Sequence, residues 1–125
     1  MAVVDYIIDG HVATITINRP ESRNAINSEV AVRLTDAWRD IRDNNNVRVA
    51  ILTGTGSVFC AGADLGQLIP LIAGNRGAEN EWDEKFLADK TIIESALLRE
   101  FDTEKPVIAA INGHAIAGGM EIVQG

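Results

Sequence analysis

One long amphipathic segment lies between two short runs of β-branched residues, and this order limits the folds that are open to the chain. Residues 28–42 repeat apolar side chains at helical spacing, which predicts a helix with one apolar face, and Asn27 or Ser28 can cap its start. Residues 12–17 alternate as a half-buried strand does, and residues 47–53 are apolar enough at their centre to predict a strand covered on both faces. Strand, helix and strand in this order predict a βαβ unit with a right-handed connection.

The flanking segments extend this α/β pattern. Residues 3–8 precede the first unit and are joined to it through Asp9-Gly10, which predicts an opening hairpin. Residues 107–111 predict another fully buried strand, and residues 82–101 a second long helix. The polar, acidic residues 73–84 predict a surface loop or mobile insertion whose carboxylates form a solvated face.

Composition excludes several classes of function. The 18 acidic and 11 basic residues give a net charge of -7, which opposes non-specific binding to nucleic acid or to an anionic membrane. A single cysteine, Cys60, and two histidines allow neither an internal disulfide nor a Cys/His zinc site. There is no long apolar run, no basic and apolar leader, no phosphate loop and no Gly-x-Ser-x-Gly elbow. We therefore expect a cytoplasmic protein without a metal.

Two segments of small residues, 60–64 and 113–119, each follow a predicted strand. Loops after strands are where α/β folds bind ligands, and small residues leave the peptide N–H groups accessible. If two such donors converge, they form an oxyanion hole. A helix that begins near Gly118 would place Glu121 one turn along on the same face, so a carboxylate would lie beside the donors.

Structural explanations of the same residues remain open. Small residues after a strand also allow tight packing of helix on sheet, and a glutamate in the first turn of a helix also complements the helix dipole. Asp64 is explained as an N-cap and Cys60 as a small buried hydrophobe. His114 is a candidate for acid–base chemistry, although no partner for it is evident. Trp38 is predicted to be a core residue, whereas Trp82 is a candidate for lining a pocket.

Three blocks of the sequence, residues 18–26, 58–65 and 105–121, resemble in order the enoyl-CoA hydratase/isomerase (crotonase) superfamily. The resemblance covers the whole chain and implies an α/β fold built as a spiral of ββα units, the ClpP/crotonase fold. It also implies that residues 1–125 form the N-terminal part of a crotonase-like domain. The chain would then be truncated, with the C-terminal half and the helical region absent.

The resemblance assigns roles to particular residues. The amides of Ala63 and Gly118 would be the oxyanion donors, and Glu121 would be the first of the two glutamates that activate water in hydratases. The substrate is an acyl-CoA, so coenzyme A is part of the substrate and no separate cofactor is implied. The positions that contact or enclose coenzyme A in the family are Arg23, Ala25, Ala61, Ala63, Asp64, Leu65 and Gly118.

The leading hypothesis is an enoyl-CoA hydratase that adds water across the 2,3 double bond of a 2-enoyl-CoA. An enoyl-CoA isomerase or a related thioester enzyme is the alternative, because Glu121 alone does not fix the reaction. A hypothesis of another class is a non-catalytic fragment that binds acyl-CoA or another subunit. The resemblance implies a homo-oligomer, a trimer or hexamer, for the full-length form, and the acyl-chain preference stays open.

Overall fold

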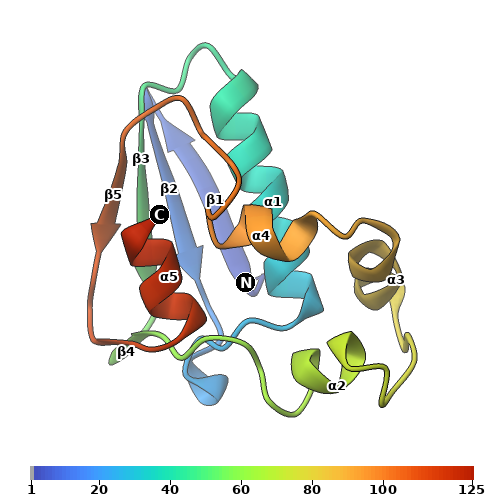
Figure 1. Cartoon of the computed structure of the whole chain (residues 1–125). Helices are drawn as coiled ribbons and strands as arrows, with labels where there is room; N and C mark the ends of the chain where they lie inside the picture. Colours follow the sequence, from blue (N-terminus) through green and yellow to red (C-terminus); the bar gives the residue numbers. More distant parts are fainter. Residues whose placement is uncertain (1) are drawn as a thin grey trace.

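The computed structural model describes residues 2–125 and contains a four-stranded sheet, a two-stranded sheet and helices packed beside them (Figure 1). A short 3-10 helix at Pro20–Ser22 precedes the first α-helix. The strands are β1 (Val4–Asp9), β2 (Val12–Ile17), β3 (Val49–Gly54), β4 (Val58–Cys60), β5 (Val107–Ala110) and β6 (His114–Ala115). The helices are α1 (Ser28–Asp43), α2 (Leu68–Ile72), α3 (Glu81–Ala88), α4 (Ile92–Ala96) and α5 (Gly118–Gln124).

The larger sheet has the strand order β1-β2-β3-β5. β1 and β2 form the predicted antiparallel hairpin, with its turn at Gly10 and His11, one residue later than expected. β2 precedes α1 in the sequence and β3 follows it, and the two strands pair in parallel, which confirms the βαβ unit. β3 also pairs in parallel with β5, and β4 pairs in parallel with β6. Because β1–β2, β3–β4 and β5–β6 are each followed by helix, the chain has the repeated ββα units that the resemblance implies.

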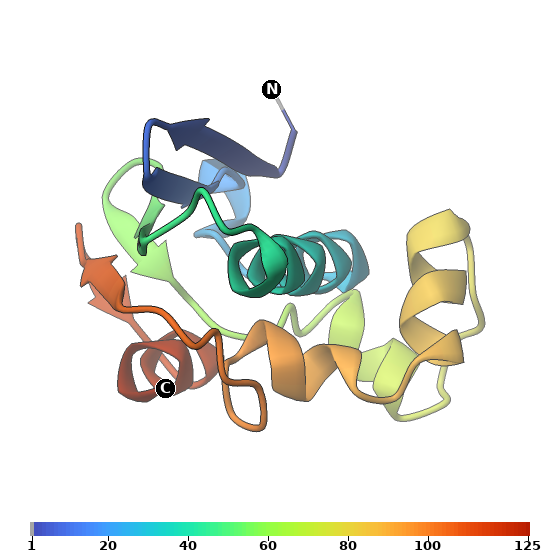
Figure 2. The same cartoon turned by 90° about the horizontal axis from the view of Figure 1, so that it is seen from above.

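Helix α1 lies at the centre of the core. The Asn27 side chain caps it by accepting the amide of Val30 at 2.9 Å, as predicted for this position. In Figure 2, α1 lies between the β1–β2 hairpin and a row formed by α5 and α4. Leu34 and Trp38 on its apolar face are fully buried, and Trp38 Nε1 donates to the carbonyl of Ala96 at 3.1 Å. The prediction that Trp38 belongs to the core is therefore confirmed.

The expectation that β3 and β5 are covered on both faces is wrong. Ala50 and Leu52 of β3 are buried on the side of α1, but Ile51 between them is only partly buried. Ile108 of β5 is 55% exposed. The reason is that the helices of residues 2–125 lie on one side of the larger sheet (Figure 2), so its other face is not covered within this part of the chain.

The single helix expected over residues 82–101 is also wrong, because α3 and α4 are separate. Between them the Asp89 carboxylate accepts the amide and the hydroxyl of Thr91, at 2.9 and 2.6 Å. An aspartate that binds the backbone two residues ahead competes with helical hydrogen bonds, which explains the break. The prediction that the carboxylates of residues 73–84 are solvated is wrong for Asp83. Its relative exposure is only 1%, and it contacts Ser28 and Arg76.

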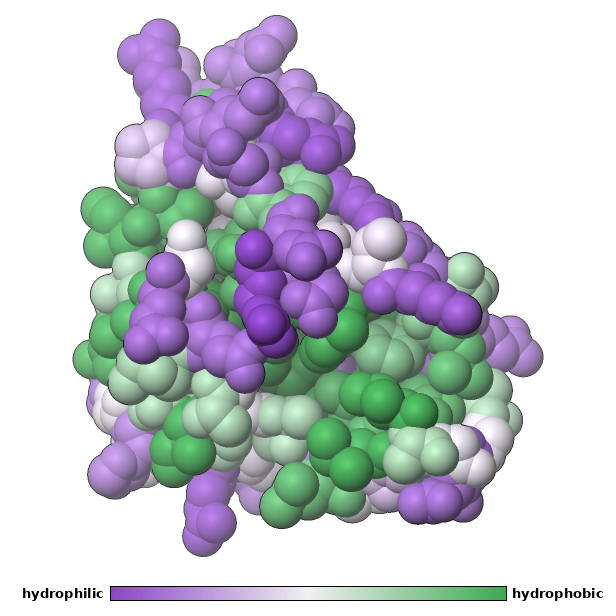
Figure 3. Space-filling model, in the orientation of Figure 1, coloured by the Kyte–Doolittle hydropathy of each residue, from purple (hydrophilic) through white to green (hydrophobic). Residues whose placement is uncertain are grey.

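The surface divides into polar and apolar regions. Figure 3 shows hydrophobic side chains gathered over β5 and around α5, α4 and α2, while hydrophilic side chains cover the top of the view and form a patch at its centre. Ile69 and Ile72 of α2 and Met120 of α5 are among the exposed apolar residues. None of the helices in residues 2–125 is both long enough and apolar enough to span a bilayer.

Candidate functional site

The two small-residue loops predicted from the sequence meet in the structure. Gly62, in the loop after β4, has φ +91°, and a Cβ placed on it would lie 3.1 Å from the amide nitrogen of Gly118. A Cβ placed on Gly119 would overlap the carbonyl oxygen of Cys60. Both positions therefore need glycine, since only glycine leaves room for the two backbones to approach.

The amides of Ala63 and Gly118 at this junction donate no hydrogen bond within residues 2–125, and neither do those of their neighbours Leu65 and Ala117. A Cβ built on Gly118 would lie 3.7 Å from the nitrogen of Ala63, so the two residues are in close proximity. α5 begins at Gly118, as predicted, and Ala117 before it adopts φ 49° and ψ -114°. A non-glycine residue with such a backbone is costly and is retained only where its surroundings impose it.

Glu121 lies one turn into α5 from Gly118. Its Oε2 atom is 3.3 Å from Nη1 of Arg99, yet it accepts no hydrogen bond from residues 2–125. Arg99 also approaches Glu94 at 3.5 Å, so its guanidinium lies between two carboxylates. Glu121 and Arg99 line one hollow of about 500 Å³, together with Leu98, Gln124 and Gly125. No signal in the sequence identified Arg99 as the partner of Glu121.

The structure gathers six of the residues predicted to contact coenzyme A around one shallow groove of about 410 Å³. They are Arg23, Ala25, Ala61, Ala63, Asp64 and Leu65. Gly118, the seventh, does not line this groove but adjoins it through its contact with Gly62. Arg23 is exposed and pairs with no carboxylate of residues 2–125, so its charge is available at the groove.

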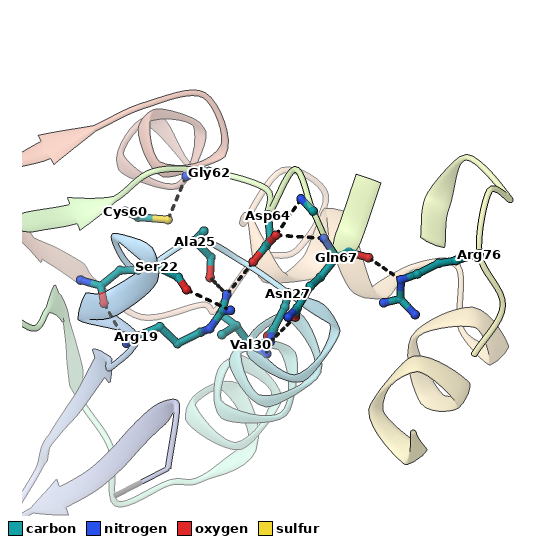
Figure 4. A network of polar contacts seen from close by, with 12 residues as sticks. Arg19, Ser22, Ala25, Asn27, Val30, Cys60, Gly62, Asp64, Gln67 and Arg76 are labelled. Atoms are coloured by element: carbon teal, nitrogen blue, oxygen red, sulfur yellow. Dashed lines mark hydrogen bonds and ion pairs between the residues drawn. The ribbon is translucent and has the colours of Figure 1, made fainter. Parts of the chain in front are cut away.

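Asp64 fixes the wall of this groove with both carboxylate oxygens. Oδ1 accepts the amides of Gly66 and Gln67, each at 2.9 Å, and Oδ2 lies 3.2 Å from Nη1 of Arg19. Figure 4 shows the carboxylate between these partners. Asp64 therefore acts as the predicted N-cap: its carbonyl also accepts the amide of Leu68 at 2.9 Å, although regular helix α2 begins only at Leu68.

Two buried polar residues beneath the groove were not among the predicted site residues. The Arg19 side chain donates to the carbonyl of Ala25 at 2.7 Å as well as to Asp64 (Figure 4). Asn24 is fully buried at φ 56°; its Oδ1 accepts the amide of Arg19, and its Nδ2 donates to the carbonyls of Thr55 and Val58. Both belong to the residue block 18–26, so the resemblance contained a signal for them although their roles were not assigned.

The remaining candidates lie away from the two amides or lack reactive character. Cys60 is buried, as predicted, and burial raises the pKa of its thiol, so the sulfur stays neutral. His114 is exposed on β6. Trp82 does not line the groove but lines two other hollows, as predicted for a pocket residue, and the cations of Arg33 and Lys85 lie 4.5 and 4.7 Å from the centre of its ring.

Comparison with known proteins supplies the family. The family model described as enoyl-CoA hydratase/isomerase matches residues 8–124. The chain belongs to this family. Among curated members, it is 37% identical over 116 residues to enoyl-CoA hydratase EchA19 of Mycobacterium tuberculosis, which covers 93% of the chain and 41% of the relative. It is 36% identical over 116 residues to (E)-benzylidenesuccinyl-CoA hydratase of Thauera aromatica, covering 92% of the chain and 41% of the relative.

Solved structures of the enoyl-CoA hydratase/isomerase family share the fold. The chain superposes on an enoyl-CoA hydratase of Bacillus anthracis with a TM-score of 0.73 and 32% identity, covering 97% of the chain and 44% of that structure. A carnitinyl-CoA dehydratase of Mycobacterium avium gives a TM-score of 0.71 and 36% identity, covering 98% and 42%. The architecture is thus the expected crotonase fold, and the chain spans about 41% of the length of the first curated relatives.

Proposed function

We propose that the chain carries the oxyanion hole and part of the coenzyme A groove of an enoyl-CoA hydratase. The observation that supports this is the pair of amides on Ala63 and Gly118, which have no acceptor within residues 2–125 and belong to loops brought together by glycine. When water adds to a 2-enoyl thioester, negative charge develops on the thioester oxygen. Two fixed N–H donors stabilise that charge, and loss of one such donor slows a reaction by ~10²–10³-fold.

The groove would hold the coenzyme A part of the substrate. Its walls are mostly small residues and backbone, which suits close approach of an extended ligand, and Arg23 offers a cation to a phosphate. A local cation matters because the net charge of -7 repels an anionic ligand elsewhere on the surface. No cofactor other than the coenzyme A of the substrate is part of this proposal.

Glu121 would position water and transfer its proton. It lies one turn from Gly118 on the helix that carries a proposed donor, and its carboxylate lines a hollow with Arg99, which contacts Oε2. Hydratases of the family use a second glutamate, and no candidate residue identified here fills that place. Glu121 is therefore proposed as the first member of the pair.

Replacing Glu121 by glutamine in the complete protein tests this role. We expect kcat for hydration of crotonyl-CoA to fall ~10²–10⁴-fold with little change in KM, because the amide keeps the shape of the side chain but cannot accept the proton. The matched control is Glu81→Gln at the exposed start of α3, which should keep the activity of the unaltered protein. Unchanged turnover in Glu121→Gln would refute the assignment.

The same assay separates the alternatives. The family covers isomerases as well as hydratases, and one glutamate beside the proposed donors suits either reaction. Movement of a 3-enoyl double bond without hydration would identify an isomerase. Binding of coenzyme A without either reaction would identify a non-catalytic binding fragment.

A further inference from the structure

The segment between α2 and α3 is anchored by a buried carboxylate. Asp83 Oδ2 lies 2.7 Å from Nη1 of Arg76 and accepts the amide of Glu79 at 3.0 Å, while Oδ1 accepts the hydroxyl of Ser28 at 2.6 Å. The hydrogen bond from Arg76 is the main cause that lowers the pKa of Asp83 to about 2, so the pair is charged at neutral pH. The anchor therefore fixes Arg76 against the first residue of α1.

The guanidinium that binds Asp83 also reaches the wall of the groove. Nε of Arg76 donates to the carbonyl of Gln67 at 2.9 Å, and Figure 4 shows the side chain extending toward that turn. The Gln67 amide in turn donates to Asp64, which lines the groove and directly follows Ala63. One side chain thus connects a buried anchor to the segment that carries a proposed oxyanion donor.

The turn is also held by Asp64 itself and by Asn27, whose Nδ2 donates to Oε1 of Gln67 at 3.3 Å, but its outer side is open to solvent. Leu65 is 81% exposed, and α2 has only five residues, too few for a helix to be stable by itself. Arginine suits a double role because its planar guanidinium presents several donors in fixed directions. A lysine ammonium would be a single compact charge with no Nε–H donor.

We propose that Arg76 is a positioning residue for the acyl-CoA groove, which holds the turn from Asp64 to Gln67 in place from the anchor at Asp83. This inference rests on the proposed function of the groove. It assigns a task to residues 73–84, which the sequence predicted to be a surface loop or mobile insertion. Arg76 contacts neither substrate nor reacting atoms in this proposal; it acts through the turn.

The test compares Arg76→Lys with Arg76→Ala in the complete protein. The lysine keeps a charge for Asp83 but loses the bond to Gln67, so we expect a melting temperature close to that of the unaltered protein. Amide hydrogen exchange at Gly66 and Gln67 should become about tenfold faster, and KM for crotonyl-CoA should rise about tenfold with a smaller change in kcat. Arg76→Ala should show the same changes together with a lower melting temperature, because Asp83 loses its partner.

The matched control is Arg42→Lys, which alters an exposed pair with Asp43 outside the groove. It should change neither the amide exchange at Gly66 and Gln67 nor the KM. Arg76→Lys with unchanged exchange and unchanged KM would overturn the proposal. So would a fall in melting temperature and kcat with no effect on KM, since that pattern describes a purely structural ion pair. Exchange is measured without substrate, so failure of the unaltered protein to bind coenzyme A would count against the proposed function alone.

Discussion

The region around α1 and the region around β5 and α5 differ in how completely they bury their apolar side chains. Ala13, Ile15 and Ile17 of β2 are fully buried against α1. Ile108 of β5, Ile116 and Met120 are all among the exposed apolar residues. The face of the sheet that packs on α1 is thus buried within residues 2–125, whereas the region that supplies Gly118 and Glu121 leaves an apolar surface open, the kind of surface that favours association.

The largest loss of stability should come from truncating the tryptophan at the centre of the region around α1, for which the tryptophan of α3 serves as the comparison. Trp38 is fully buried and hydrogen-bonded to Ala96, so Trp38→Ala should lower the free energy of unfolding by about 3–5 kcal/mol. Trp82 is half-buried between two cations, so Trp82→Ala should cost only about 1 kcal/mol. Denaturant unfolding measures both free energies, and equal losses in the two variants would contradict the expectation that the buried tryptophan contributes more.

A fall in pH should lower the free energy of unfolding through Asp83, which contacts the start of α1. Its pKa is about 2 in the folded protein against an ordinary value of 3.8, so ionised Asp83 stabilises the fold by about 2 kcal/mol at neutral pH. That contribution is present above the ordinary pKa and is lost as the pH falls from about 4 to 2. Asp83→Asn should flatten the fall in unfolding free energy across this range, and an unaltered slope would show that Asp83 is not its source.

The smallest effect on folding is expected at β5. Ile108→Thr should change the free energy of unfolding by less than about 0.5 kcal/mol, because the side chain is exposed and threonine suits a strand. We expect the 125-residue chain by itself to associate, and this variant should reduce that association in light scattering. Ile15→Thr, at a fully buried position of β2, is the matched control that should unfold the chain instead. Equal association of the Ile108 variant and the unaltered chain would show that this face is not involved.

Features that depend on local spacing were predictable from the sequence. The cap at Asn27 and the start of α5 at Gly118 follow from residue type and order, and the structure confirms both. The break at Asp89 was missed because apolar spacing carries no information on a side chain that binds its own backbone. The burial of Asp83 was missed because its partner Ser28 lies far away in the sequence.

The residues of the candidate site also divide into those that the sequence could predict and those that it could not. Small residues after strands indicated where Ala63 and Gly118 would lie, because the backbone itself supplies the chemistry there. The arginines that contact the site, Arg19, Arg76 and Arg99, were not predicted as site residues. A long side chain can reach many partners, so only the tertiary packing decides which carboxylate or carbonyl it binds.

The contact between Gly119 and the carbonyl of Cys60 has a consequence for the order of folding. It joins positions that are far apart in the chain, so its formation costs more loop-closure entropy than local contacts do, and we expect it to form after β3 and β5 have paired. On a ribosome, the amide of Ala63 is exposed well before its companion at Gly118 has been synthesised. Pulse-labelled hydrogen exchange should accordingly protect α1 early and α5 last, so that the ability to bind an oxyanion is the final property the chain acquires.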